Sequence, residues 1–223
     1  MKIINLYQGK LRPFGPRGKS SAIHKTPVES AYVNALGMVD DHQADKRFHG
    51  GPEKALHQYA LSSYEKLAKH HPIYHKRFVP GVIGENISAT DMHDHSVCIG
   101  DIYQMGDIKV QVSSPRIPCW KISHKIEVDG LDKFVEKHAI TGWYYRVLEE
   151  GTLNVNDSIE LLERPNPELS IQTFMHIVTR KIDDQVIIKS ASDAEGLDPE
   201  WQKRLQQRLV SNSGGSTNPE YTV

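Results

Sequence analysis

The sequence lacks the features that assign a chain to several common protein classes. Its 223 residues include two cysteines, Cys98 and Cys119, which are too few for a disulfide framework. It has no apolar run of about 18 residues, so we expect no membrane-spanning helix. The opening residues, MKIINLYQGK, lack the basic, apolar and small-residue order of a signal peptide. These absences favour a folded protein of the reducing cytoplasm.

Several kinds of chemistry also lack their usual sequence signals. There is no Gly-x-Gly-x-x-Gly, Walker-type or Gly-x-Ser-x-Gly motif for dinucleotides, nucleoside triphosphates or serine hydrolysis. The formal net charge of -1 argues against broad binding to a nucleic-acid backbone. The 12 histidines form no zinc-binding spacing, and we interpret those of KHHPIYH and DMHDH as solvated surface residues.

Residues 1–165 read as short strands separated by turns. The predicted strands are KIINLYQ, SAIHKTPV, ALHQYAL, DSIELLER and a meander of SVCIG, DIYQM and IKVQVS. LSSYEKLAKH has helical spacing and is predicted to be capped by Ser62 or Ser63. Many short strands with few helices predict a mainly β fold with α elements, built as a closed or nearly closed β-barrel.

The pattern changes to helical after RPNPELS, where two prolines mark a boundary at residues 165–167. Residues 166–212 are predicted to form a three-helix extension, with an apolar stripe in SIQTFMHIV. Asp198 and Pro199 suit the N-cap and first turn of the last helix. Residues 213–223 are polar and predicted to be a flexible tail. In that last helix, Lys203, Arg204 and Arg208 suit a solvated face or a dimer surface better than a nucleic-acid contact.

Cys119 lies in VSSPRIPCWKI, between two prolines and two cations. Free cysteine is usually a buried structural residue, which is our interpretation of Cys98. Arg116 and Lys121 favour the thiolate form of Cys119, which is the nucleophilic and metal-binding form. The segment also follows a predicted strand, where a barrel presents side chains at its mouth. Cys119 is therefore the leading candidate for a reactive residue.

Two glycine-containing loops are further candidates for ligand-binding sites. Gly50 and Gly51 allow close backbone approach, and Lys46, Arg47, His49 and Lys54 surround them with positive charge, so this turn suits an anion. An ordinary turn with solvated cations is the alternative. In GVIGENISATD, Glu85 and Asn86 would either bind a polar ligand or hold the loop together by hydrogen bonds.

Taken in order, FHGGPEKALHQY, GENISATD and CIGDIYQMGDIKVQVSSPRIPC resemble the successive motifs of the MOSC domain, named for the molybdenum-cofactor sulfurase C-terminal region. GKSSAIHKTPV resembles the opening strand of that domain, and the helical extension resembles that of stand-alone bacterial MOSC proteins of the YiiM type. One motif differs. The family commonly has Gly-Leu-x-Gly-Asp where this chain reads GMVDD, residues 37–41.

The resemblance implies a mixed-strand barrel, like the pyruvate-kinase barrel, that binds a molybdopterin-type molybdenum cofactor. Cys119 would be the metal ligand and His49 an acid in catalysis. The expected activity is reduction of N-hydroxylated bases, such as 6-hydroxylaminopurine, to amines with electrons from a separate reductase. The cofactor-binding residues expected on this basis are Lys25, Lys46, His49, Gly50, Gly51, Lys54, Asn86 and Arg116.

Two other functions fit the same residues. Cys119 could carry sulfur as a persulfide or act as a nucleophile without molybdenum, because an activated thiolate serves both purposes. Alternatively, the barrel would hold or deliver the cofactor while the helices dock onto a partner. The helical extension is also compatible with a homodimer.

Overall fold

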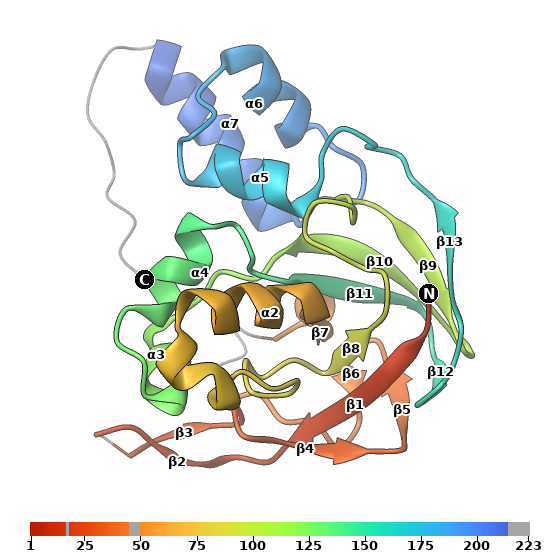
Figure 1. Cartoon of the computed structure of the whole chain (residues 1–223). Coiled ribbons are helices and arrows are strands. Elements are labelled where there is room, and N and C mark those ends of the chain that lie inside the picture. Colours follow the sequence, from red (N-terminus) through yellow and green to blue (C-terminus); the bar gives the residue numbers. More distant parts are fainter. Residues whose placement is uncertain (17, 45–49, 214–223) are drawn as a thin grey trace.

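The computed structural model describes residues 1–16, 18–44 and 50–213. In this part of the chain, eight strands form one sheet, and two small sheets flank it (Figure 1). The large sheet runs in the order β13 (Ile159–Glu163), β9 (Ile102–Met105), β10 (Ile108–Pro115), β11 (Trp143–Glu149), β7 (Leu56–Gln58), β8 (Ile87–Ala89), β1 (Ile3–Gly9) and β4 (Lys25–Val28). The small sheets are β12 (Gly151–Asn154) with β5 (Ser30–Asn34) and β6 (Gly37–Met38), and β2 (Arg12–Phe14) with β3 (Lys19–Ser21).

The large sheet is mixed, because β7 and β8 pair in parallel while its other pairs are antiparallel. Its pairing order ends at β13 and β4. The start of β1 also meets the start of β13 through one antiparallel bridge, Lys2 with Ser158. The amide of Ile159 donates to the carbonyl of Met1 at 2.9 Å beside this bridge. The mixed α/β fold is established, whereas the complete barrel remains a prediction.

Helices cover two regions of this framework (Figure 1). The first group is α2 (Leu61–His70), α3 (Trp120–Ile126) and α4 (Leu131–Lys137), with the 3₁₀ turn η2 (Pro72–Arg77) beside α2. A second 3₁₀ turn, η1 (Pro52–Lys54), packs against β10 and β11. The second group of helices is the C-terminal group α5 (Ile171–Val178), α6 (Gln185–Ser192) and α7 (Pro199–Ser213). A core cluster beneath α2–α4 buries Tyr59, Leu67 and Ile122. The C-terminal helices instead share the core of the large sheet.

Most predicted elements are present, but SAIHKTPV forms a strand of the large sheet only from Lys25 to Val28, and two further predictions need correction. SVCIG is a turn rather than a strand, and Cys98 forms an isolated bridge with Ser170. Helix α2 begins after Ala60, so Ser62 and Ser63 do not cap it. Ser63 instead donates to the buried Asp94 at 3.0 Å. The hydroxyl group of Ser63 therefore makes a tertiary contact, whereas the local sequence pattern predicts that it caps the helix.

The predicted start of α7 is confirmed, but one predicted surface residue is wrong. Asp198 accepts a hydrogen bond from the amide of Glu200 at 2.8 Å, as an N-cap does. Arg208 is buried, and its guanidinium donates to the carbonyl of Ile177 at 2.5 Å and pairs with Asp183. It therefore does not belong to a solvated face. Residues 214–223 of the predicted tail lie outside the described residues.

No helix within the described ranges is both long enough and apolar enough to cross a membrane.

Candidate functional site

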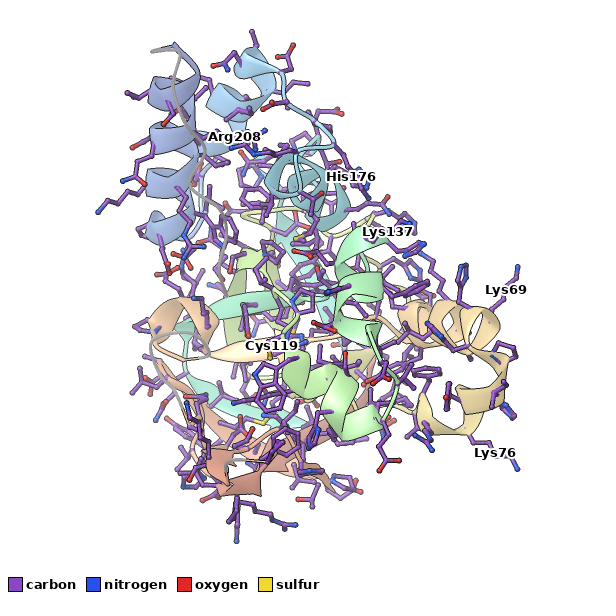
Figure 2. The ribbon with its side chains drawn as sticks, turned by 90° about the vertical axis from the view of Figure 1, so that its left-hand side faces the viewer. Lys69, Lys76, Cys119, Lys137, His176 and Arg208 are labelled. Carbon is purple, nitrogen blue, oxygen red and sulfur yellow. The ribbon has the colours of Figure 1, made fainter. Side chains whose placement is uncertain are left out.

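Cys119 lies at the turn between β10 and α3. Strand β10 ends at Pro115, after which four residues lead to α3, and Cys119 occupies the N-cap position with an extended backbone. Its carbonyl accepts from the amide of Ile122 at 3.0 Å. The thiol is half-buried, whereas Cys98 is buried. Figure 2 shows Cys119 where the chain enters α3. The segment that contains the two prolines therefore places this thiol between the end of a strand and the start of a helix.

A pocket that is open to solvent adjoins Cys119. Its walls come from the chain between the end of β3 and the start of β4, the loop after β6, η1, β7 and the loop before β8. The β10–α3 turn, the start of α3 and β11 complete them. The side chains at the site fall into a cationic group, one carboxylate and several polar or aromatic groups. Its lining includes Ser21, Ile23, Lys25, Asp41, His42, Lys54, His57, Gly84, Asn86, Arg116, Cys119, Lys121 and Tyr144.

Arg116 is 5% exposed, although it lines the pocket. Its backbone amide donates to Gly142, and the Nη1 atom has no hydrogen-bond partner among the described residues. A buried guanidinium nitrogen without an acceptor is costly, because it has lost water without gaining a replacement. This atom is therefore suited to an anionic oxygen of a bound molecule.

A buried ion pair forms another wall. The carboxylate of Asp41 accepts from Lys25 Nζ at 2.6 and 2.7 Å, from the amide of Gly9 at 2.6 Å and from Asn86 Nδ2 at 2.9 Å. Burial lowers the pKa of Lys25, and the adjacent Asp41 opposes that shift. The charge of Lys25 is thus balanced within the protein.

Asn86 is used mainly to hold this wall together. Its side-chain amide donates to Asp41 and to the carbonyl of Tyr7, and its oxygen accepts from the amide of His57 at 3.1 Å. Both N–H groups therefore have protein partners. The structure favours the loop-holding interpretation of Asn86 over direct ligand binding.

Lys54 connects the pocket to the C-terminal helices. It lines the pocket from the end of η1, and its Nζ lies 3.7 Å from Glu200 in the first turn of α7. Gly51 precedes η1 with a φ of 88°, which favours glycine. Gly50 and Gly51 are not part of the described pocket lining. The predicted residues Lys46 and His49 lie outside the described residues.

Sequence reasoning missed two pocket residues that come from paired strands. His57 on β7 and Tyr144 on β11 are register partners, and their ring centroids are 5.4 Å apart. Tyr144 interacts electrostatically with both Arg116 and Cys119. This proximity depends on pairing between strands more than 80 residues apart in the sequence, so no local signal identifies it.

A second buried polar network lies beside the pocket. Glu85 accepts from the hydroxyl of Tyr64 at 2.5 Å and from the amide of Gly81 at 2.6 Å, and burial raises its pKa. Lys125 on α3 donates to the carbonyl of Ile23 at 2.7 Å. Burial lowers the pKa of Lys125 to about 8. These contacts fix the segments that carry pocket residues.

Comparisons with known proteins agree with this architecture. The MOSC domain family matches residues 45–160. Protein YiiM of Escherichia coli is 31% identical over 209 residues, which cover 93% of this chain and 92% of that protein. A protein named Reductase from Gibberella moniliformis is 35% identical over 179 residues, covering 79% of this chain and 32% of that protein.

A solved structure of a YiiM protein is also similar to this chain. The crystal structure of YiiM from Geobacillus stearothermophilus superposes with a TM-score of 0.78 at 29% identity. The match covers 92% of this chain and 97% of that chain. The chain therefore belongs to the MOSC domain family, in its YiiM-type branch.

Proposed function

We propose that this chain binds a molybdopterin-type molybdenum cofactor and reduces N-hydroxylated compounds to amines. The proposal depends on one observation: a half-buried thiol, Cys119, and the buried Arg116, whose Nη1 has no hydrogen-bond partner among the described residues, line the same pocket. A thiolate suits a soft, redox-active metal, and a buried guanidinium suits phosphate. Membership of the MOSC family supports the same cofactor.

The chemistry of the lining fits such a cofactor. Cys119 would hold the metal, while Arg116, Lys54 and Lys121 would hold its phosphate group. Lys25 adds little net charge because Asp41 balances it. Its part in binding would be to fix the pocket wall, together with Asn86. Ligation of the metal would require the deprotonated form of the thiol.

The reaction is R–NH–OH + 2 e⁻ + 2 H⁺ → R–NH₂ + H₂O, where the N–O bond breaks. Bound molybdenum supplies the two-electron redox change. The chain's own residues would bind the substrate, restrict water and supply protons. The predicted acid His49 lies outside the described residues, and His42 and His57 are the histidines of the described lining.

The two electrons would come from a separate reductase. Two cysteines cannot ligate an iron–sulfur cluster of the four-thiolate type, so this chain holds no such relay. A relative named Reductase, of which the matched segment is 32%, supports an oxidoreductase role.

We also propose that the protein works in the cytoplasm, since both cysteines are free thiols. We further propose that the Lys2–Ser158 bridge closes the sheet into a barrel.

The direct test is conversion of 6-hydroxylaminopurine to adenine by protein purified from a cofactor-producing host and supplied with a chemical or enzymatic reductant. Wild type and Cys98→Ser should form adenine, and Cys119→Ser should lose most of this activity, because the ligand of the metal is removed. Bound pterin without adenine formation under any reductant would favour the cofactor-carrier alternative.

A further inference from the structure

His57 is a buried histidine in the wall of the pocket that adjoins Cys119. It lies on β7, lines the pocket and is 5% exposed. His42, the other histidine of the described lining, is exposed on the loop after β6. Histidine is the side chain that most readily exchanges a proton near neutral pH. His57 is therefore suited to move a proton inside the pocket, away from bulk solvent.

Neighbouring segments hold His57 in place. Its amide donates to Asn86 Oδ1 at 3.1 Å, and its carbonyl accepts from the amide of Asn86 at 2.7 Å. The imidazole ring packs against Tyr144 of β11, the strand beside β7 in the large sheet (Figure 1). Gly142 leaves room for this ring, because a Cβ there would lie 3.1 Å from Nε2 of His57. Since the two bonds to Asn86 use the backbone of His57, a substitution of its side chain leaves them in place.

Other ionisable side chains of the lining are less suited to give up a proton. Burial raises the pKa of Tyr144, so its hydroxyl keeps its proton near neutral pH. Lys25 and Lys54 are paired with carboxylates, which favour the charged form of each amine. The guanidinium of Arg116 does not lose its proton in a protein. These groups fix charge in the pocket, whereas His57 can change its charge.

The charges around His57 depend on what the pocket holds. Among the described lining residues the cations outnumber the carboxylate, and these groups are Lys25, Lys54, Arg116 and Lys121 against Asp41. The remaining titratable groups of this lining are His42, Cys119 and Tyr144. Asp94 lies behind Gly142, whose amide donates to it at 2.8 Å, and burial raises the pKa of that carboxyl. Positive charge disfavours a protonated imidazole, and a bound anion offsets it. A cofactor phosphate on Arg116 would therefore favour the protonated form of His57.

We propose that His57 is a catalytic residue that donates a proton to the hydroxyl oxygen of the substrate as the N–O bond breaks. This inference rests on the proposed function and assigns its proton donor. Of the two protons in the reaction, His57 supplies the one that completes water, and solvent supplies the one that reaches nitrogen. The external reductase supplies both electrons. The neutral imidazole then regains a proton from water, because the pocket is open to solvent.

The rate of 6-hydroxylaminopurine reduction in a single turnover tests this role. Wild type and His57→Gln are purified from a cofactor-producing host and reduced beforehand, so that the rate does not depend on the reductase. His57→Gln should lose about 100-fold in this rate, because a general acid contributes at least about that factor. Its molybdenum and pterin content should stay at the level of wild type. In His57→Ala, added imidazole should restore part of the lost rate.

His95→Gln is the matched control, because His95 is exposed and does not line the described pocket. This variant should keep the rate of wild type. A titration by NMR then separates a proton donor from a residue that only shapes the pocket. In the cofactor-loaded protein, the imidazole signal that is absent from His57→Gln should titrate between about pH 6 and 8. The rate of wild type should fall as the pH rises through the same value, because the donor loses its proton, and His57→Gln should lack this fall.

Three results would overturn the assignment of His57 while the proposed function stands. They are a wild-type rate in a folded, metal-loaded His57→Gln, loss of bound molybdenum from that variant, and an imidazole of His57 that stays neutral down to about pH 5. His57→Asn serves the same comparisons if His57→Gln does not fold. If wild type reduces no N-hydroxylated compound with any reductant, the proposed function fails, and the assignment of His57 fails with it.

Discussion

The GMVDD loop reaches its conformation with a single glycine, and Asp41 holds it in place by hydrogen bonds. Gly37 has a φ of 110°, and a Cβ there would lie 2.1 Å from the carbonyl oxygen of Ala55. Asp40 has no positive φ, so the loop needs no glycine at that position. Asp41 then accepts from Gly9, Lys25 and Asn86. The carboxylate is a structural centre that holds the segments of the pocket wall.

Asp41→Asn should therefore destabilise the protein strongly. The substitution leaves the side chain of Lys25, which is 7% exposed, without its counter-charge. Loss of one partner of a buried ion pair costs about 3 to 5 kcal/mol. Urea denaturation measures the change, with the adjacent and exposed Asp40→Asn as control. Equal stability of the two variants would show that Asp41 does not hold the wall.

At the scale of elements, α3 is fixed by Lys125. This side chain donates to the carbonyls of Ile23 at 2.7 Å and of Gly81 at 3.4 Å. One bond reaches the segment after β3, and the other reaches the loop before β8. Because Cys119 is the N-cap of the same helix, Lys125 indirectly holds the thiol against two pocket walls.

This anchor predicts a pH dependence of stability. The pKa of Lys125 is about 8 in the folded protein, against an ordinary value of 10.5. Between these values the unfolded chain binds a proton that the folded protein does not, so stability should rise with pH. From pH 7.5 to 9.5, the free energy of unfolding of wild type should increase by about 1 to 2 kcal/mol relative to Lys125→Met. A constant difference between the two proteins would refute the assignment.

Elements with strong local signals could be predicted from the sequence. The spacing in LSSYEKLAKH and SIQTFMHIV and the Asp-Pro start of α7 identify their helices correctly. The position of SVCIG before the glycine break at Gly100 predicts the first strand of a meander, which the structure does not contain. Its amide at Cys98 instead bonds the side chain of Asp101 at 2.9 Å, which closes a turn.

The candidate site could be predicted in part, where the local sequence indicates the chemistry of a residue. Cys119, Arg116 and Lys54 have neighbours in the sequence that indicate their chemistry, and all three line the pocket. His57 and Tyr144 come together through strand register, and the Lys25–Asp41 pair spans 16 residues. Contacts of this kind depend on the folded topology, which local patterns do not encode.

At the scale of the whole molecule, the C-terminal helices and the large sheet share one apolar core. Phe174, Leu197, Trp201 and Leu205 belong to the same buried cluster as Val112 of β10. Backbone bonds cross the boundary as well, including Ile171 to Val97 and Asp198 to Ser113, both at 2.9 Å. We therefore propose that residues 1–165 and 166–212 are regions of one folding unit.

A shared core predicts one cooperative unfolding transition. Calorimetry should give a single peak whose calorimetric and van't Hoff enthalpies agree. Phe174→Ala removes a fully buried ring that contacts Trp201, and it should cost about 3 to 5 kcal/mol and lower the midpoint of the entire transition. A second peak, or a shift of only part of the heat, would mean that the helices fold separately.

The metal content of the purified protein tests directly whether Cys119 holds molybdenum. Wild type, Cys119→Ser and Cys98→Ser are expressed in a cofactor-producing host, and molybdenum and released pterin are measured per chain. We expect molybdenum in wild type and in Cys98→Ser, because Cys98 is buried, and its loss in a folded Cys119→Ser. Equal molybdenum in wild type and Cys119→Ser, or none in wild type after added cofactor, would contradict it.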